Sequence, residues 1–343
     1  MDGFLQNSRD EPPPVLKSKA APAKARKEKA RKEKQSESTF SQTIATVVSR
    51  VLTIFEQEVE SQQLYYHGLD HVTGVARKAE LIFDTVIPFY TKEDTPKCGW
   101  DRQRSLLYLS AIAHDMQQIF LPQSDPHSSR RRRSGDSEKA TVDKLIEFLQ
   151  QTSLSIKKPN NRFNRDDIAI IKEAIEATIC EYDATDGSIY QPSMYSQHRA
   201  LYGDGQPISL VARCLALADI GTLGIEGIAA YNREGSLLFL EENLDIIPFI
   251  KNKSAYDQPF RENVRQRLLK RARFEIAFAR GRLNRLDTEL EGLPQAAIAS
   301  LKQNVFKHLT PDTLEQLKRA TPTADNTSLA TLLDYFQLER YVL

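Results

Sequence analysis

Two apolar stretches of this chain, each with the spacing of a buried helix, end in residues that can carry a charge. One stretch runs into the pair His114-Asp115 and the other into Asp219, while His71 lies in a third stretch of the same kind. An ionisable side chain in such a setting costs several kcal/mol unless a metal ion or a hydrogen-bond partner compensates it. Two imidazoles and two carboxylates suit Mn, Fe, Co, Ni, Zn or, less well, Mg. The sequence therefore predicts one divalent metal site.

Apolar residues recur at three- and four-residue spacing through most of the chain after Thr39, which is the period of a helix. The clearest stretches are residues 44–55, 72–89, 106–120, 142–149 and 168–179. Asn164 and Asp167 form a typical helix start. No segment shows the alternation expected of a strand. We expect an all-α fold, a helical bundle with the metal site at its centre.

The chain divides by composition into three parts. Residues 1–38 combine a run of prolines with lysine, arginine, alanine and glutamate and have few large apolar side chains, so they predict a disordered basic tail. Residues 39–240 contain every candidate ligand and form the predicted metal-binding domain. Residues 241–343 predict a C-terminal helical extension packed on the bundle, beginning with an arginine-rich amphipathic stretch at 260–290.

Charge and cysteine content narrow the class of protein. The formal net charge is +1, far from that of a dedicated nucleic-acid-binding protein, although the N-terminus is basic. Three cysteines, Cys98, Cys180 and Cys214, are too few and too scattered for a disulfide framework. The most apolar window, 208–231, contains charged residues, which argues against a membrane span. We expect a cytoplasmic protein without a membrane partner.

His67 and His71 are four residues apart and share one face if their segment is helical. Such a pair alone more often reflects one core and one surface histidine. Together with His114-Asp115 and Asp219, the pair resembles the HD superfamily of metal-dependent phosphohydrolases. The ligand order in that superfamily is a histidine, a His-Asp doublet and a distant aspartate.

The likeness covers roughly residues 64–224. Tyr66-His67 resembles the opening motif of the small predicted metal-dependent HD phosphohydrolases and of cyclic-nucleotide phosphodiesterases, and residues 136–141 and 218–224 resemble later motifs of the former group. The resemblance implies an all-α HD domain that holds a single metal through His71, His114, Asp115 and Asp219. It further implies that His67 protonates the leaving group and that Glu138 orients water.

The chain departs from the family pattern at Gln118, where many members have an acidic residue or lysine. An amide cannot act as a general base near neutral pH. Glu138, Asp125 or metal-bound hydroxide then takes that role, or the domain is catalytically weak. The arginine run 130–133 follows the doublet closely; it either steers a polyanionic substrate or is a solvated loop.

The function expected from these features is hydrolysis of a phosphate ester of a nucleotide or small phosphorylated metabolite by a metal-bound hydroxide. Two alternatives remain open. One is a catalytically silent HD domain that binds a metal or nucleotide as a regulatory or interaction module, which Gln118 favours. The other is a nucleic-acid-associated protein, which only the basic tail and the arginine run favour.

Overall fold

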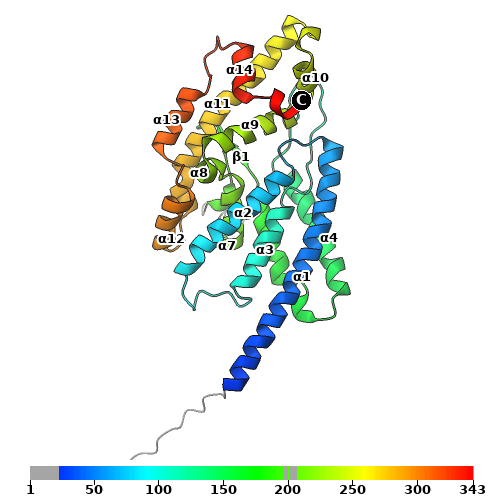
Figure 1. Cartoon of the computed structure of the whole chain (residues 1–343), viewed down its shortest axis with the longest axis vertical. Helices are drawn as coiled ribbons and strands as arrows, with labels where there is room; N and C mark the ends of the chain where they lie inside the picture. The colour runs from blue at the N-terminus through cyan, green and yellow to red at the C-terminus, as the bar shows by residue number, and fades with distance from the viewer. Residues whose placement is uncertain (1–22, 196–199, 201–206, 343) are drawn as a thin grey trace, which may run out of the picture.

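The structure is a computed structural model and describes residues 23–195, 200 and 207–342. Over these ranges it is an all-α bundle with one short hairpin, so the predicted fold class is confirmed (Figure 1). None of the helices described is long and apolar enough to span a membrane. The helices are α1 (Ala23–Gln62), α2 (Leu69–Val86), α3 (Trp100–Ala113), α4 (Asp136–Ser155), α5 (Arg165–Glu176), α7 (Leu210–Asp219), α8 (Thr222–Glu226), α9 (Ile228–Glu242), α10 (Ile246–Lys251), α11 (Gln258–Glu289), α12 (Gln295–Ser300), α13 (Pro311–Ala320), α14 (Leu329–Phe336) and α15 (Glu339–Val342).

Helix α1 begins earlier than the sequence analysis proposed. It starts at Ala23, so a helical backbone runs through much of the segment assigned to a disordered tail, and residues 1–22 lie outside the described ranges. Alanine, lysine, arginine and glutamate are all strong helix formers, which explains a helical backbone in this segment. Figure 1 shows the N-terminal turns of α1 projecting beyond the other helices. The described part of α1 enters the core at Phe40.

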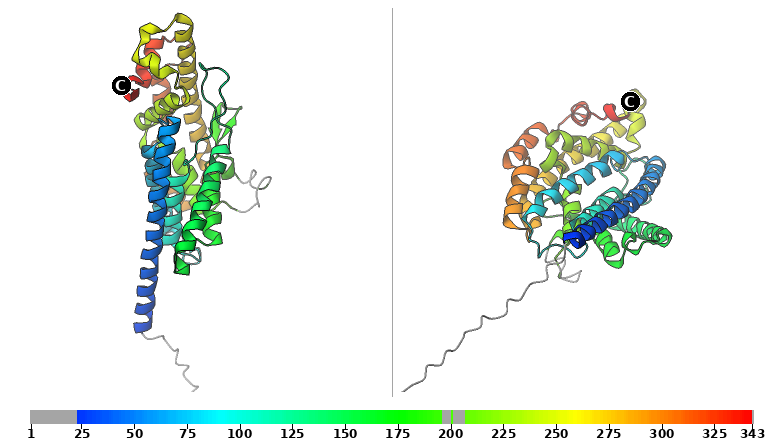
Figure 2. Two further views of the ribbon diagram at one scale, coloured as in Figure 1. Left: turned by 90° about the vertical axis from the view of Figure 1, so that its right-hand side faces the viewer. Right: turned by 60° about the horizontal axis from the view of Figure 1, so that its bottom comes forward.

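The centre of the molecule is a layer of three helices, α2, α3 and α7, which pack against one another. Helix α1 lies along α3 on one side and α5 packs on α3 and α7 (Figure 2). The apolar positions of these helices, such as Val75, Leu107 and Leu215, are fully buried in one large core. Burial of this kind stabilises the fold by about 25 cal/mol for each Å² of apolar surface removed from water. The site residues lie at the ends of this central layer.

The predicted helix start at Asn164 is confirmed. The Asn164 side chain accepts a hydrogen bond from the backbone amide of Asp167 at 2.9 Å, and Asp167 accepts one from the amide of Asn164 at 2.8 Å. This reciprocal capping box satisfies two amides that have no partner within the helix. Asp167 also binds Arg102 of α3, which ties the start of α5 to the central layer.

The expectation that the chain has no strand is wrong for one short hairpin. Strand β1 (Glu181–Asp183) pairs antiparallel with β2 (Ser188–Tyr190), so that Tyr182 is opposite Ile189. Three-residue strands are too short to show alternation. The turn between the two strands contains Gly187, which adopts a φ of 73°, a conformation that favours glycine.

The C-terminal helices form a second layer against the first. Helices α9, α11 and α14 pack around their own core, which includes Leu240, Leu268 and Phe336. The last turns of α11 and helix α12 join the main core, and α12 contacts α2. The hairpin lies against α11. A pocket is enclosed between these two layers and the loop that precedes α4.

Candidate metal centre

The four predicted ligands come from three helix ends. His71 lies in the first turn of α2, His114 caps the C-terminus of α3 with Asp115 directly after it, and Asp219 is the last residue of α7. Because α2, α3 and α7 pack together, these ends meet at one point. One ligand atom from each of the four residues lies within 4.8 Å of the others. The structure therefore brings together the whole set that the sequence analysis selected.

The distances show a shared centre. The Nε2 atom of His71 lies 3.1 Å from Asp115 Oδ2 and 3.5 Å from Asp219 Oδ1. The Nε2 atom of His114 lies 3.0 Å and 3.4 Å from the same two oxygens. Both imidazoles are buried, and neither Nε2 has a directed hydrogen bond. The lone pairs of four groups thus converge where a cation would be expected.

Hydrogen bonding fixes the tautomer of one imidazole. Nδ1 of His114 lies 2.8 Å from the carbonyl oxygen of Ala111 and donates to it. In the neutral ring the Nε2 atom then carries the lone pair, which is the form that binds a metal. Buried nitrogens without partners are costly, and a divalent ion coordinated by His71 and His114 would remove that cost. The donor set therefore fits a divalent metal.

The charges of the metal-free cluster support the same conclusion. Burial alone would lower the pKa of His71 and His114, but Asp115 and Asp219 outweigh it and raise both values, that of His114 well above its usual range. Burial likewise opposes ionisation of the two aspartates, yet the imidazoles hold the pKa of each well below its ordinary value. Protons in the metal-free protein thus offset the two negative charges that a metal would meet.

His67 lies beside the cluster and is not part of it. It occupies the bend before α2 and not the helix itself, so it does not continue the helical face of His71. Its Nε2 atom is 3.9 Å from Asp115 Oδ2, while its Nδ1 atom is 2.5 Å from Oε1 of Glu241. The contact with Glu241 turns Nε2 toward the site. The predicted position next to the metal ligands is therefore observed.

Glu241 is the main residue that the sequence analysis missed. It is fully buried at the end of α9, and its Oε2 atom accepts hydrogen bonds from the backbone amides of Tyr65, Tyr66 and His67 at 3.0 to 3.2 Å. Burial would raise its pKa, but His67 and Arg132 lower it to about 2. Glu241 is therefore ionised and holds the ring of His67 in place. The sequence carries a signal that could have identified Glu241, because it ends an apolar helical stretch as Asp219 does.

Glu138, the predicted water-orienting residue, lines the same pocket from the first turn of α4. Burial raises its pKa. In the described part of the chain its carboxyl group makes no hydrogen bond to the four ligands. The structure therefore brings Glu138 to the wall of the pocket without a hydrogen bond to the four candidate ligands.

The arginine run divides into anchored and exposed members. Arg130 donates to the carbonyl oxygens of Glu241 and Gln62 at 2.9 Å and stacks over Phe120. Arg132 points into the site, whereas Arg131 and Arg133 are exposed. Neither expectation for the run, steering or simple solvation, describes all four side chains.

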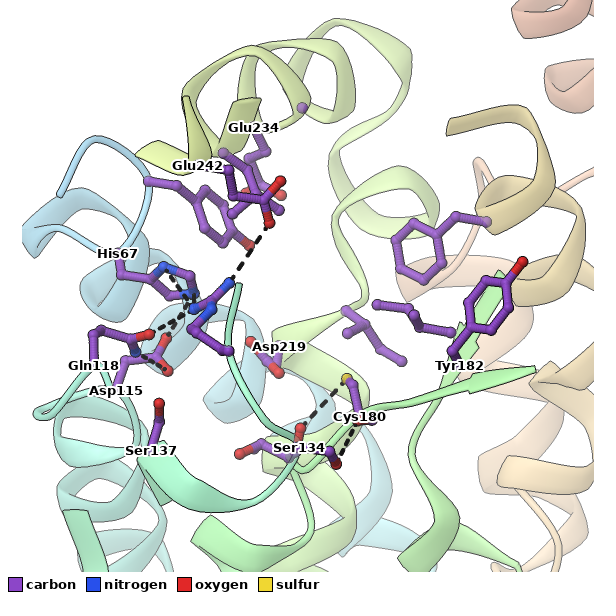
Figure 3. Close-up of a pocket in the computed structure, with 18 of the residues that line it drawn as sticks. His67, Asp115, Gln118, Ser134, Ser137, Cys180, Tyr182, Asp219, Glu234 and Glu242 are labelled. Carbon is purple, nitrogen blue, oxygen red and sulfur yellow. Dashed lines mark hydrogen bonds and ion pairs between the residues drawn. The ribbon is translucent and has the colours of Figure 1, made fainter. Parts of the chain in front are cut away.

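Gln118 connects the centre to this loop. Its amide nitrogen donates to Asp115 Oδ1 at 3.1 Å, and its Oε1 atom accepts from Arg132 Nη1 at 2.5 Å. The same Nη1 atom lies 3.2 Å from His67 Nε2 (Figure 3). The residue that departs from the family pattern is thus buried within the network around the site.

The pocket has a volume of about 670 Å³, within the range of small-molecule sites. Its polar side is formed by His67, Asp115, Gln118 and Asp219 (Figure 3). Its apolar side comes from the hairpin, α9 and α11, which also contribute the charged residues Glu234, Glu242 and Arg271. The residues of this apolar side are Tyr182, Ile189, Tyr231, Leu238, Phe274 and Phe278.

Comparisons with known proteins found no match for this chain. No protein-family model, no curated protein and no solved structure matches the chain. The likeness to the HD superfamily therefore rests on the ordered residues alone. The described structure shows a buried His71, His114, Asp115 and Asp219 group that could hold a metal ion.

Proposed function

We propose that this chain is a metal-dependent phosphohydrolase that cleaves a phosphate ester of a nucleotide or small phosphorylated metabolite. The observation that carries the proposal is the convergence of two unpartnered imidazole nitrogens with two carboxylates at a pocket that also presents His67. A divalent ion held there would stabilise negative charge on phosphoryl oxygens and lower the pKa of water.

The chain's own residues support the remaining chemistry. His67 is held by Glu241 through Nδ1, so a proton on Nε2 faces the pocket and can pass to the departing ester oxygen. That oxygen leaves as an alcohol, and water supplies the new oxygen on phosphorus. Glu241 stays ionised and keeps the ring of His67 oriented through Nδ1. The apolar side of the pocket gives room for the organic part of the substrate.

The test is a screen of metal-loaded protein against phosphomonoesters, nucleotides, pyrophosphates and cyclic nucleotides, with His67→Ala beside the wild type. The variant should retain stoichiometric metal and lose roughly 10² to 10⁴-fold in turnover, the usual contribution of a positioned general acid. Aryl phosphates should show a smaller loss, because their leaving groups need no proton. Equal turnover by wild type and variant would refute the role of His67.

A silent metal or nucleotide-binding domain is the second candidate, and Gln118 is the observation that favours it. Gln118 offers no general base, and Arg132 lies on His67. A metal-loaded wild type that binds nucleotides but turns over none of the esters would establish this second function.

A further inference from the structure

We propose that Arg132 forms the phosphate-binding subsite of this pocket and that Gln118 is the residue that positions it. The substrate class, a phosphate ester, rests on the proposed function; the subsite itself rests on the contacts described below. Arg132 would contact phosphoryl oxygens directly, whereas Gln118 would act through Arg132.

Arg132 differs from Arg271 in having no carboxylate within hydrogen-bond distance in the described part of the chain, although it forms a long ion pair with Glu242 as Arg133 does with Asp136. Arg271 lies 3.3 Å from the carboxylate of Glu275, and Arg133 is exposed and faces Asp136 at 3.9 Å. The guanidinium of Arg132 instead contacts two groups that carry no negative charge, the amide of Gln118 and the ring of His67. In the described part of the chain its nearest carboxylate contact is with Glu242, at 4.0 Å.

This arrangement leaves donors of Arg132 available beside the metal ligands. A guanidinium has five N–H donors in a planar fork that matches two oxygens of a phosphate. The contact with Gln118 and the contact with His67 both use Nη1. An oxyanion bound at the candidate metal site on one side could accept hydrogen bonds from the remaining donors of Arg132 on the other. A tetrahedral phosphoryl group has enough oxygens to bind both.

Gln118 suits this role because an amide has a donor and an acceptor. The NH₂ group holds Asp115, a metal ligand, and the carbonyl oxygen holds Arg132. Glutamate could not donate to Asp115, and lysine could not accept from Arg132. The departure from the family pattern at Gln118 is thus explained as a bridge between the metal centre and the phosphate subsite.

The backbone around Arg132 is fixed on both sides, so the subsite is formed before a ligand arrives. Two residues earlier, Arg130 is bound to the end of α9 through its amide at 2.7 Å and through its side chain. Two residues later, the Ser134 hydroxyl donates to the carbonyl oxygen of Cys180 at 2.8 Å. Preorganisation of this kind lowers the entropic cost of binding.

The experiment measures binding of inorganic phosphate to metal-loaded full-length protein by calorimetry, with metal content determined for every variant. Arg132→Ala should weaken phosphate binding by roughly 10- to 100-fold, the size expected for lost charge-assisted hydrogen bonds. Arg132→Lys should restore part of the loss, because it keeps the charge and not the fork. Arg131→Ala is the matched control, because Arg131 is an exposed neighbour that does not line the pocket, and this variant should bind phosphate as the wild type does.

Gln118→Met tests the positioning role, since it keeps the volume and removes both polar ends. We expect metal content to be retained, phosphate affinity to fall by less than in Arg132→Ala, and, for any ester turned over, KM to rise more than kcat falls. A general loss of structure would instead lower metal content as well. Circular dichroism and thermal unfolding identify variants that fail to fold, and Arg132→Lys then carries the test.

Two results would overturn the inference: a wild type that binds no phosphate, or an Arg132→Ala variant with unchanged phosphate affinity and unchanged metal content. Failure of the proposed function looks different. In that case the wild type turns over none of the esters, while phosphate binding still depends on Arg132. Turnover in the wild type with phosphate affinity and KM independent of Arg132 would remove the subsite and leave the proposed function standing.

Discussion

Two buried polar clusters lie in the two layers of the molecule, and they solve the problem of buried charge differently. The first is the metal centre between α2, α3 and α7. The second surrounds Glu275, which is 1 % exposed between α9, α11 and α14 and contacts Arg271 at 3.3 Å and Tyr335 at 3.5 Å. Burial raises the pKa of Glu275 to about 7. Even beside Arg271, burial favours the protonated form of this carboxyl group.

The metal centre cannot be neutralised so simply, because four lone-pair donors face one point. Protons on His71 and His114 can offset the charges of Asp115 and Asp219, yet both Nε2 atoms and Nδ1 of His71 are left without hydrogen-bond partners. The difference teaches that burial of a charged residue is weak evidence for function. Convergence of several acceptors without donors is much stronger evidence. The predictions below test this contrast, beginning with the largest effect.

Asp219→Asn should abolish stoichiometric binding of a divalent metal, because it removes a charged ligand from the centre. The metal should also cease to raise the melting temperature, an effect worth about 2.7 kcal/mol in the wild type at a metal concentration 100 times Kd. Metal analysis and thermal unfolding measure both. Glu275→Gln serves as the control and should bind metal normally; a full complement of metal in Asp219→Asn would refute the site.

Glu241→Gln should lower turnover of a phosphate ester by roughly 10- to 100-fold, as expected when a residue that orients a functional histidine is lost. It should also change stability. The pKa of Glu241 is lowered to about 2 in the folded protein, so its contribution, on the order of 3 kcal/mol, is present above about pH 4.5 and lost as the pH falls toward 2. Denaturant unfolding between pH 2 and 7 should show that the variant lacks this dependence. The same acid dependence in wild type and variant would contradict the assignment.

Glu275→Gln should change the pH dependence of stability in the opposite direction to Glu241→Gln. The folded pKa of Glu275 is raised, so its contribution is present below about pH 4.5 and lost as the pH rises through about 7. The variant should therefore be more stable than the wild type at pH 8, by on the order of 2–3 kcal/mol, and similar to it at pH 4.5. Unfolding at the two pH values measures this. A variant less stable than the wild type at pH 8 would show that the Glu275 carboxylate is ionised and paired.

Metal binding should release protons and tighten as the pH rises. Asp115 and Asp219 raise the pKa of His71 and His114 in the metal-free protein, and a metal must displace those protons. Between pH 6 and 8 the apparent Kd should fall by roughly tenfold per pH unit for each proton displaced. Calorimetry in buffers of different ionisation enthalpy counts the protons. An affinity independent of pH would mean that both imidazoles are already neutral.

Deletion of residues 1–22 should have the smallest effect. Neither polar cluster contains a residue before Phe40, where the described part of α1 enters the core. Turnover, metal content and melting temperature should match those of the full chain. A loss of turnover at unchanged stability would make the basic N-terminus part of substrate binding.

The bundle and the clustering of the four candidate ligands could be predicted because they leave local signals. A helical period repeats within each stretch, and His114, Asp115 and Asp219 each interrupt apolar sequence. The Glu241 contact left no such pairwise signal, because 174 residues separate it from His67 and only folding brings them together. The use of Arg132 was hidden as well. Four consecutive arginines look alike in the sequence, and only the folded structure shows that Arg130 is bound to the end of α9 while Arg132 contacts Gln118 and His67.

The short hairpin has a consequence for how such a pocket can change over time. It forms part of the apolar wall through Tyr182 and Ile189, yet it supplies no metal ligand. Arg285 of α11 fastens it by contacts of 2.7 Å with Asp183, Asp186 and Ser188. The side chains of this wall can therefore be substituted one at a time while the contacts of Arg285 keep the hairpin in place. In evolutionary terms, the apolar wall of the pocket and the candidate metal ligands are encoded in separate segments, so the first can change while the second is held fixed.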